Sequence, residues 1–285
     1  MNGPRSFPGL PRRVPRPTGS LAAVARKYAA IVATAVRHRM AYIGDSLGRP
    51  VFFALILFVF CRLWQTVFAD GRAPVVGFAA RESLWYLVMT EAILLSAPRL
   101  QGRIDEEVKT GAVATLLNKP CHYVGYHLAF ALGEALPVFL LNLAVGVVTA
   151  RVLIGPLPVA PAAVLALFPA VTLAMTLSVL IGLCLALLAF WVEDAAPFFW
   201  VYQKMLFILG GLMIPLDFLP GWLQAVAGWL PFRTILCGPA RLLVRFSVAD
   251  AGSLFLWQAA WIAVFAVVTV ALYHAGIRQV ESHGG

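Results

Sequence analysis

Some charged side chains fall within stretches of sequence that are otherwise apolar enough to lie in a lipid bilayer. Glu91 and Glu134 lie inside two such stretches, and Arg62 lies near the outer end of another. Charged residues inside a membrane are costly, and they often mark a substrate path or a proton relay. No histidine accompanies the glutamates as a relay would require, so we expect Glu134 to make a structural or gating hydrogen bond. Arg62 can extend its head group to the membrane surface, and for Glu91 a structural and a functional role stay equally open.

A membrane-embedded enzyme that modifies lipid is the first alternative, and it would need acids, bases or metal ligands grouped at one membrane depth. Only the two glutamates could supply them, because the five histidines lie dispersed at the expected membrane edges. The four cysteines form no Cys-x-x-Cys pair, which argues against a disulfide framework or a zinc site. The spacing of Cys121, His122 and His127 does not place a ligand set on one helix face. We therefore expect no catalytic residue, metal or cofactor in this chain.

The sequence also lacks the phosphate-binding pattern Gly-x-x-x-x-Gly-Lys-Ser/Thr, since it contains no Gly-Lys pair. If ATP drives this protein, a separate subunit must bind the ATP and its Mg²⁺. The net charge of +9 comes from basic residues at the edges of apolar stretches, not from a basic patch with interleaved aromatic residues. Nucleic acid is therefore not an expected partner.

The composition indicates an all-α protein that crosses the membrane several times. Of the 285 residues, 61% are hydrophobic and 12% are charged, whereas a soluble domain has about 25% charged residues. Apolar runs near the ~20 residues needed to cross a bilayer predict six transmembrane helices. The third and fourth are longer and should tilt or protrude. The six runs are about 50–68, 78–97, 126–154, 162–191, 198–214 and 254–274.

Lysine and arginine near the ends of these runs predict the orientation, because cytoplasmic loops carry an excess of both. They are frequent before residue 50 and in the segment 99–121, and sparse in the loop after 154. With six spans, both termini and the segment 99–121 should be cytoplasmic. The arginines after the fifth span point the other way, but the first span usually dominates.

The N-terminal region divides into two parts ahead of the six-span domain at 46–285. Residues 1–20 are rich in proline and arginine, which is typical of a disordered basic arm. Residues 21–45 carry apolar residues at helical spacing with basic flanks. This pattern predicts an amphipathic helix that lies along the membrane surface, because no soluble core is available to cover it.

The segment 99–121 is charged and compact between two apolar runs, and it predicts a short cytoplasmic helix. Its carboxylates Asp105, Glu106 and Glu107 should lie near the helix N-terminus, where the helix dipole favours them. Leu116 and Leu117 follow, and Pro120 ends the element. A helix that is acidic at one end and apolar at the other can dock in a groove of a partner protein. An ordinary solvated loop is the alternative, which the ordered pattern disfavours.

The stretch 210–232 is apolar but interrupted by prolines. Proline removes a hydrogen-bond donor and disfavours helix in the residue before it. The chain should therefore turn near 215–220 and again near 231, and the nine residues between are too short to cross a membrane. We expect a hairpin that dips in from the outer face, with the tryptophans near the interface and the aspartate capping or facing water. Its candidate residues are Pro215, Asp217, Pro220, Trp222, Trp229 and Pro231.

Several motifs together resemble the permease subunit of bacterial type-2 ABC exporters, in a six-span branch whose substrates are mostly unassigned. They occur in the order and spacing of that family and cover nearly the whole chain after residue 20. They are EEVKTGAVATLLNKP (106–120), FWVED (190–194), GGLMIPLDFLPGWLQAVAGWLPF (210–232), Gly238-Pro239-Ala240 and the tail GIRQVESHGG (276–285). The tail has fewer basic residues than the family pattern.

The resemblance implies an exporter in the bacterial inner membrane that moves a hydrophobic or amphipathic substrate. Two permease chains, identical or related, would sit on a dimer of ABC ATPase subunits. The segment 21–45 would be the connecting helix, 104–118 the coupling helix, and 216–233 a re-entrant hairpin at the outer face. The residues expected to couple to the ATPase are Asp105, Glu106, Glu107, Gly111, Leu116, Leu117 and Pro120.

A transporter that works alone on an ion gradient is the second alternative. Such transporters are commonly built from inverted repeats with broken helices at matching positions. This sequence has a broken apolar element only after the fifth span, which argues against that class.

Overall fold

The computed structural model describes residues 21–68, 79–98, 100–110, 121–192 and 194–283. Within these ranges the chain forms helices and no strand, as expected where a bilayer leaves the backbone to satisfy its own hydrogen bonds. The elements are α1 (Leu21–Ala41), η1 (Ile43–Ser46), α2 (Gly48–Phe68), α3 (Ala80–Leu95), α4 (Leu100–Lys109), α6 (Tyr123–Ile154), α7 (Pro161–Ala186), η2 (Leu187–Phe190), α8 (Ala196–Leu209), η3 (Leu216–Phe218), α9 (Gly221–Trp229), α10 (Pro231–Ile235), α11 (Cys237–Val244) and α12 (Val248–His283).

Four helices in the described part of the chain are long and apolar enough to cross a membrane: α2, α6, α7 with η2, and α12. They match the expected first, third, fourth and sixth spans to within a few residues, except that α12 is longer at both ends. The other two expected spans correspond to shorter helices, α3 with 16 residues and α8 with 14. The architecture is thus the predicted all-α, multi-pass membrane protein.

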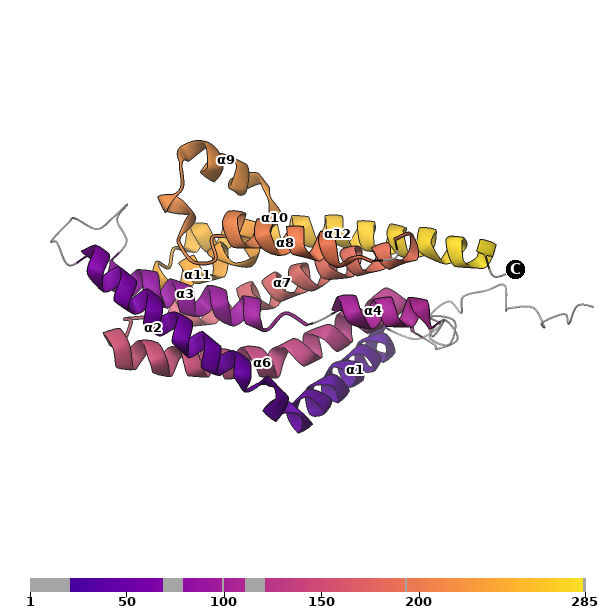
Figure 1. The fold of residues 1–285 in the computed structure, drawn as a ribbon, viewed down its shortest axis with the longest axis horizontal. Coiled ribbons are helices and arrows are strands. Elements are labelled where there is room, and N and C mark those ends of the chain that lie inside the picture. The colour runs from indigo at the N-terminus through magenta and orange to yellow at the C-terminus, as the bar shows by residue number, and fades with distance from the viewer. Residues whose placement is uncertain (1–20, 69–78, 99, 111–120, 193, 284–285) are drawn as a thin grey trace, which may run out of the picture.

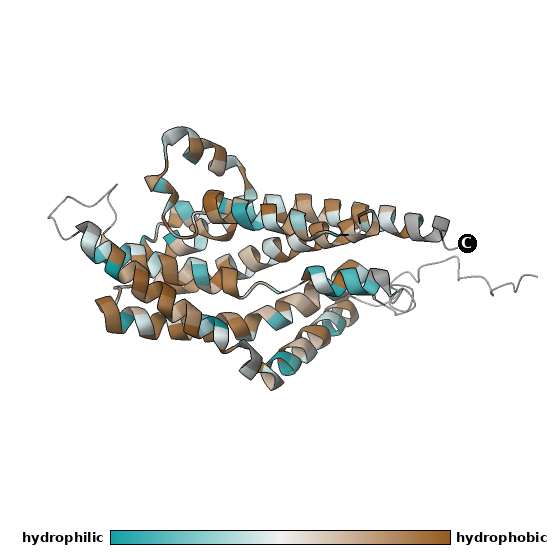
Figure 2. Cartoon of the chain, viewed as in Figure 1, coloured by the Kyte–Doolittle hydropathy of each residue, from teal (hydrophilic) through white to brown (hydrophobic). Residues whose placement is uncertain are grey.

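The long helices run side by side, and the two segments of special interest lie at opposite ends of the bundle (Figure 1). The helix α4 lies near the C-terminal end of α12, whereas α9 projects from the other end. Figure 2 shows hydrophobic residues along most of the long helices and hydrophilic residues gathered on α4. Large apolar side chains such as Val51 and Phe52 are exposed, as expected for a surface that meets lipid.

The helix α7 is the centre of the bundle, since it packs against α4, α6, α11 and α12. Buried polar groups join the helices around it. Gln258 of α12 donates hydrogen bonds to the carbonyl oxygens of Ala170 in α7 and Thr234 in α10, at 3.0 and 2.9 Å. Such bonds between helices help to hold membrane proteins together, because association in lipid lacks a hydrophobic driving force.

The helix α1 packs closely against the first half of α6 because glycine faces it there. A Cβ atom at Gly133 would lie 2.6 Å from the backbone oxygen of Val32 and 2.7 Å from the Cβ of Ala35. At Gly125 a Cβ would lie 2.6 Å from the hydroxyl of Tyr28. The two glycines are eight residues apart and so share one face of α6. The small-residue face of α6 therefore fixes how α1 crosses it.

We predict that Gly133→Ala lowers the thermal midpoint of the purified protein, because the added methyl must displace the backbone of α1. Overpacking of this kind destabilises by about 1–3 kcal/mol. The matched control is Gly252→Ala in α12, where no atom lies within 4 Å of the added carbon. There the better helix propensity of alanine should leave the midpoint equal or slightly raised. Equal midpoints for the two variants would contradict the close α1–α6 contact.

Candidate coupling site and outer hairpin

An apolar face fixes α4 to the end of α7. Leu100 and Ile104 are four residues apart and therefore lie on the same side of the helix. Both are buried, and they belong to a cluster with Leu183 and Leu187. The helix consequently begins at Leu100, earlier than the expected 104, because this apolar pair packs on the bundle.

This start corrects the predicted position of the acidic residues. Asp105, Glu106 and Glu107 do not lie in the first turn of α4, which contains no acidic residue. They occupy its second half, where the helix dipole does not favour negative charge. Other partners must therefore stabilise the carboxylates that lie against the bundle.

An ion pair joins α4 to α6. Arg103 donates hydrogen bonds to both carboxylate oxygens of Glu134, at 3.0 and 2.9 Å, and its guanidinium lies 4.6 Å from the centre of the Phe130 ring. The Glu134 side chain is only 14% exposed, so both oxygens need a partner. Both bonds come from the Nη2 atom of Arg103, and the opposite charges make them stronger than hydrogen bonds between neutral groups. Glu134 therefore serves as the attachment point of α4 on α6.

A second polar contact binds Glu107 to α6. Tyr123 donates a hydrogen bond to the Glu107 carboxylate at 2.8 Å. The Nε2 atom of the fully buried His127 lies 3.1 Å from the same oxygen, at ion-pair distance but outside hydrogen-bond geometry. Burial raises the pKa of Glu107, but the nearby His127 and Tyr123 outweigh it and leave that pKa below its ordinary value. Glu107 thus faces into the chain, whereas Glu106 is exposed.

The remaining coupling residues belong to the later part of the predicted helix 104–118 and to the proline that follows it. The helix ends at Lys109, and Gly111, Leu116, Leu117 and Pro120 lie outside the described residues. Asp105 is partly exposed beside Glu106. The acidic side of α4 that is turned away from the bundle is therefore formed by these two residues.

The stretch after α8 folds as predicted from its prolines, into short helices separated by turns. Pro215 precedes η3, Pro220 precedes α9, and the buried Pro231 begins α10. Trp222 and Trp229 are 69% and 72% exposed, and their amphipathic rings suit a membrane interface. Residues 216–233 are thus not part of one continuous spanning helix.

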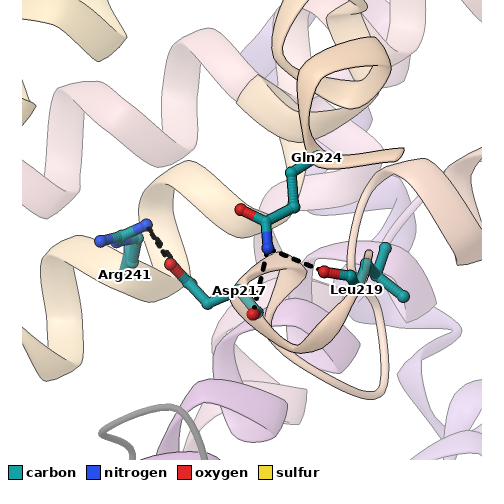
Figure 3. A network of polar contacts seen from close by, with 4 residues as sticks. All are labelled: Asp217, Leu219, Gln224 and Arg241. Atoms are coloured by element: carbon teal, nitrogen blue, oxygen red, sulfur yellow. Dashed lines mark hydrogen bonds and ion pairs between the residues drawn. The ribbon is translucent and has the colours of Figure 1, made fainter. Parts of the chain in front are cut away.

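Polar contacts hold this hairpin in shape (Figure 3). Arg241 of α11 pairs with the carboxylate of Asp217 in η3, at 3.0 Å. The Gln224 amide of α9 donates to the carbonyl oxygens of Asp217 and Leu219, at 3.2 and 2.8 Å. The Asp217 carboxylate therefore binds another part of the fold, while its own carbonyl oxygen closes the turn onto α9.

The helix α3 fastens the start of the hairpin. The hydroxyl of Tyr86 donates to the carbonyl oxygen of Gly211 at 2.6 Å, and Thr90 donates to that of Leu212 at 2.7 Å. Gly211 has a φ of 67°, and a Cβ there would lie 2.8 Å from the Tyr86 hydroxyl. Glycine is therefore required at this turn.

A cavity of about 320 Å³ opens beneath the hairpin, between η3, α9, α10 and α11. Its charged and polar lining comes from Asp217, Gln224, Arg233 and Arg241. Since Asp217 already pairs with Arg241, the lining keeps one uncompensated positive charge, that of the exposed Arg233. The cavity can therefore accommodate a small anionic group.

The other two charged candidates are not brought to either site. Glu91 is 2% exposed in α3, and no hydrogen bond to its carboxylate is found among the described residues. Arg62 is exposed on α2, and its guanidinium lies 5.2 Å from the ring of Phe58.

Four residues of these sites carry no distinguishing signal in the sequence: Arg103, Tyr123, His127 and Arg245. Arg245 pairs with Glu82 at 2.6 Å across 163 positions of chain, and only the packing of helices brings them together. Lys204 differs from these four, because the sequence shows it as the one cation inside the apolar helix α8.

A family model described as ABC-2 family transporter protein matches residues 52–284. No curated protein matches the chain.

We predict that exchanging the two charges preserves the α4 attachment, whereas reversing either one alone weakens it. Arg103→Glu or Glu134→Arg, each of which breaks the pair and sets two like charges against each other, should cost at least about 1–2 kcal/mol, with the exposure of Arg103 limiting the loss. The double exchange Arg103→Glu with Glu134→Arg should recover part of it. Thermal midpoints of the four proteins measure the coupling, and additive losses in the double variant would show that the pair does not interact.

We also predict a pH dependence for the Glu107 contact. Its pKa is lowered in the folded protein relative to the usual 4.5, so its contribution to stability is fully present above 4.5 and is lost as pH falls through the folded value. The difference in thermal midpoint between the native protein and Glu107→Gln should therefore be present at pH 7 and vanish at strongly acidic pH. A difference that stays constant with pH would contradict this assignment.

Proposed function

The chain belongs to the ABC-2 family of transporter proteins, and from that membership we propose that it is the permease subunit of an ATP-driven exporter. Membership makes it a membrane subunit of an ABC transporter rather than an enzyme. We propose further that a separate ABC ATPase dimer supplies the energy, and that the substrate is hydrophobic or amphipathic and leaves the cytoplasm or the inner leaflet.

The observation that carries this proposal is the attachment of α4. Apolar contacts bind one side of it to α7, and the Arg103–Glu134 and Glu107–Tyr123 contacts bind it to α6. A force applied to α4 therefore reaches two spanning helices at once. Its exposed acidic side, which includes Glu106, is available to an ATPase surface. Glu107 has a positioning role in this scheme, because its carboxylate already faces α6.

The position of the hairpin supports an exit at the opposite end. Figure 1 shows α4 in the half of the bundle where α12 ends, and α9 projecting sideways from the other half. Short helices at membrane depth are tolerated only against protein or a water-filled cavity, and the cavity beneath α9 meets that condition. We therefore propose that residues 216–233 gate the release of substrate on the outer side.

The assembly follows from the same family. We propose two permease chains, identical or related, in a bacterial inner membrane with both termini cytoplasmic. The helix α1, packed on the first half of α6, would then lie along the cytoplasmic surface as the connecting helix.

We predict that Leu116→Asp with Leu117→Asp abolishes ATPase binding, because the carboxylates would enter an apolar groove. Glu106→Lys should weaken binding by reversing the charge on the outward side of α4. The measurement is copurification of an ATPase subunit, together with the ATPase rate stimulated by substrate.

The matched control is Asp250→Lys, which makes the same change of charge at an exposed position in the first turn of α12. It should change ATPase binding by less than twofold, since the first turn of α12 lies outside the proposed docking surface on α4. Full ATPase binding by the double leucine variant would disprove the docking role of this segment.

A further inference from the structure

The helix α8 is apolar, yet it turns a lysine outward. Of its 14 residues only Leu206 and Leu209 are buried. Lys204 and Gln203 are exposed, in the company of apolar side chains that include Trp200 and Val201. The exposed face of α8 is therefore mostly apolar and carries one positive charge, that of Lys204.

A lysine in this position is costly if it faces lipid near the centre of a span. Lys204 lies eight residues after Ala196, which is about 12 Å along the helix axis. The chain that follows α8 stays buried through Gly210–Leu212, so the end of α8 does not open directly onto the lipid head groups. Lys204 therefore has no short route to the interface.

The described residues do not neutralise this charge. No carboxylate in that part of the chain forms a salt bridge with Lys204. Its ammonium lies 5.8 Å from the centre of the Trp200 ring, and a cation–π contact at an exposed site offsets only a small part of the cost. Within the described part of the chain, Lys204 is therefore open to a counter-charge from another molecule.

The same sign of charge continues toward the outer end. The helix α8 contacts α9 and α10, which line the cavity beneath the hairpin, and Arg233 of α10 has no carboxylate partner among the described residues. Lys204 of α8 and Arg233 of the cavity thus lie one after the other along the proposed direction of export.

We propose that the exported substrate is an amphipathic anion, whose negative group binds Lys204 in the membrane and Arg233 at the outer cavity. The apolar face of α8 would take the hydrophobic body. This inference rests on the proposed function, and it names the substrate class that the same path selects.

Binding is tested first on the whole permease chain in phosphatidylcholine nanodiscs. The probes are a brominated fatty acid and an alkyltrimethylammonium of the same length and bromine content, both of which quench tryptophan. We expect half-maximal quenching of Trp200, identified by its loss in Trp200→Phe, at an at least roughly tenfold lower concentration of the fatty acid. Equal or stronger quenching by the ammonium overturns the proposal.

Variants of Lys204 test whether its ammonium binds the anionic group of the probe. Lys204→Met should raise the half-maximal fatty-acid concentration about tenfold, and Lys204→Arg by less than about threefold. Arg62→Met removes another exposed cation, on α2, and should leave it unchanged. If Lys204→Met dissociates the permease dimer and weakens both probes equally, Lys204 pairs with the second subunit and the proposal fails.

A transport assay then tests the proposed substrate class separately from the proposed transporter function. In proteoliposomes with the ATPase, export of the fatty acid in preference to the ammonium supports the proposal. If phosphatidylglycerol added to the vesicles competes with it, the anion is a membrane lipid; if not, it is a separate amphiphile. ATP-driven export that prefers the ammonium overturns the substrate class alone. Failure of any ATPase to bind overturns the proposed function, while the quenching result still decides whether this face binds anions.

Discussion

Every charge in this protein has to find an opposite charge or water, because the bilayer core offers neither. Within the described residues, four pairs of side chains place opposite charges next to each other. Arg103–Glu134 and Glu107–His127 lie at the end of the bundle that carries α4, and Glu82–Arg245 and Asp217–Arg241 lie at the end that carries the hairpin. Between these two ionic layers the helices pack mainly through apolar side chains, with a few buried hydrogen bonds such as those of Gln258. The layers therefore fix the attachments of α4 and the hairpin.

The helix α7 connects these two layers mechanically. At one end it packs against α4, and at the other against α10 and α11. The helix α3 in turn packs on α11 and holds the backbone of Gly211 and Leu212 through Tyr86 and Thr90. Tightly packed helices resist independent movement. A displacement of α4 would thus be transmitted to the base of the hairpin through contacts that already exist.

The sequence predicts the positions of the helices well but predicts poorly which side chains form contacts between helices. Apolar length alone identifies α6, α7 and α12, and prolines identify the turns around α9. The start of α4 was misplaced because three carboxylates imitate a helix N-terminus, whereas Leu100 and Ile104 determine the helix by packing on α7. The partner of Glu134 could not be foreseen, since it depends on how two helices cross. Lys204 stands out in the sequence as a lone cation, but only its exposure on α8 shows that it needs an external counter-charge.

The short helix α8 has a consequence for the lipid around it. At 1.5 Å per residue its 14 residues extend about 21 Å, less than the ~30 Å of an average hydrocarbon core, and most of them are exposed, whereas the similarly short α3 is buried in the bundle. A short span is accommodated by thinning of the surrounding bilayer. The protein therefore carries a built-in hydrophobic mismatch, and acyl-chain length becomes a variable that sets how easily it inserts and which regions of a membrane it occupies.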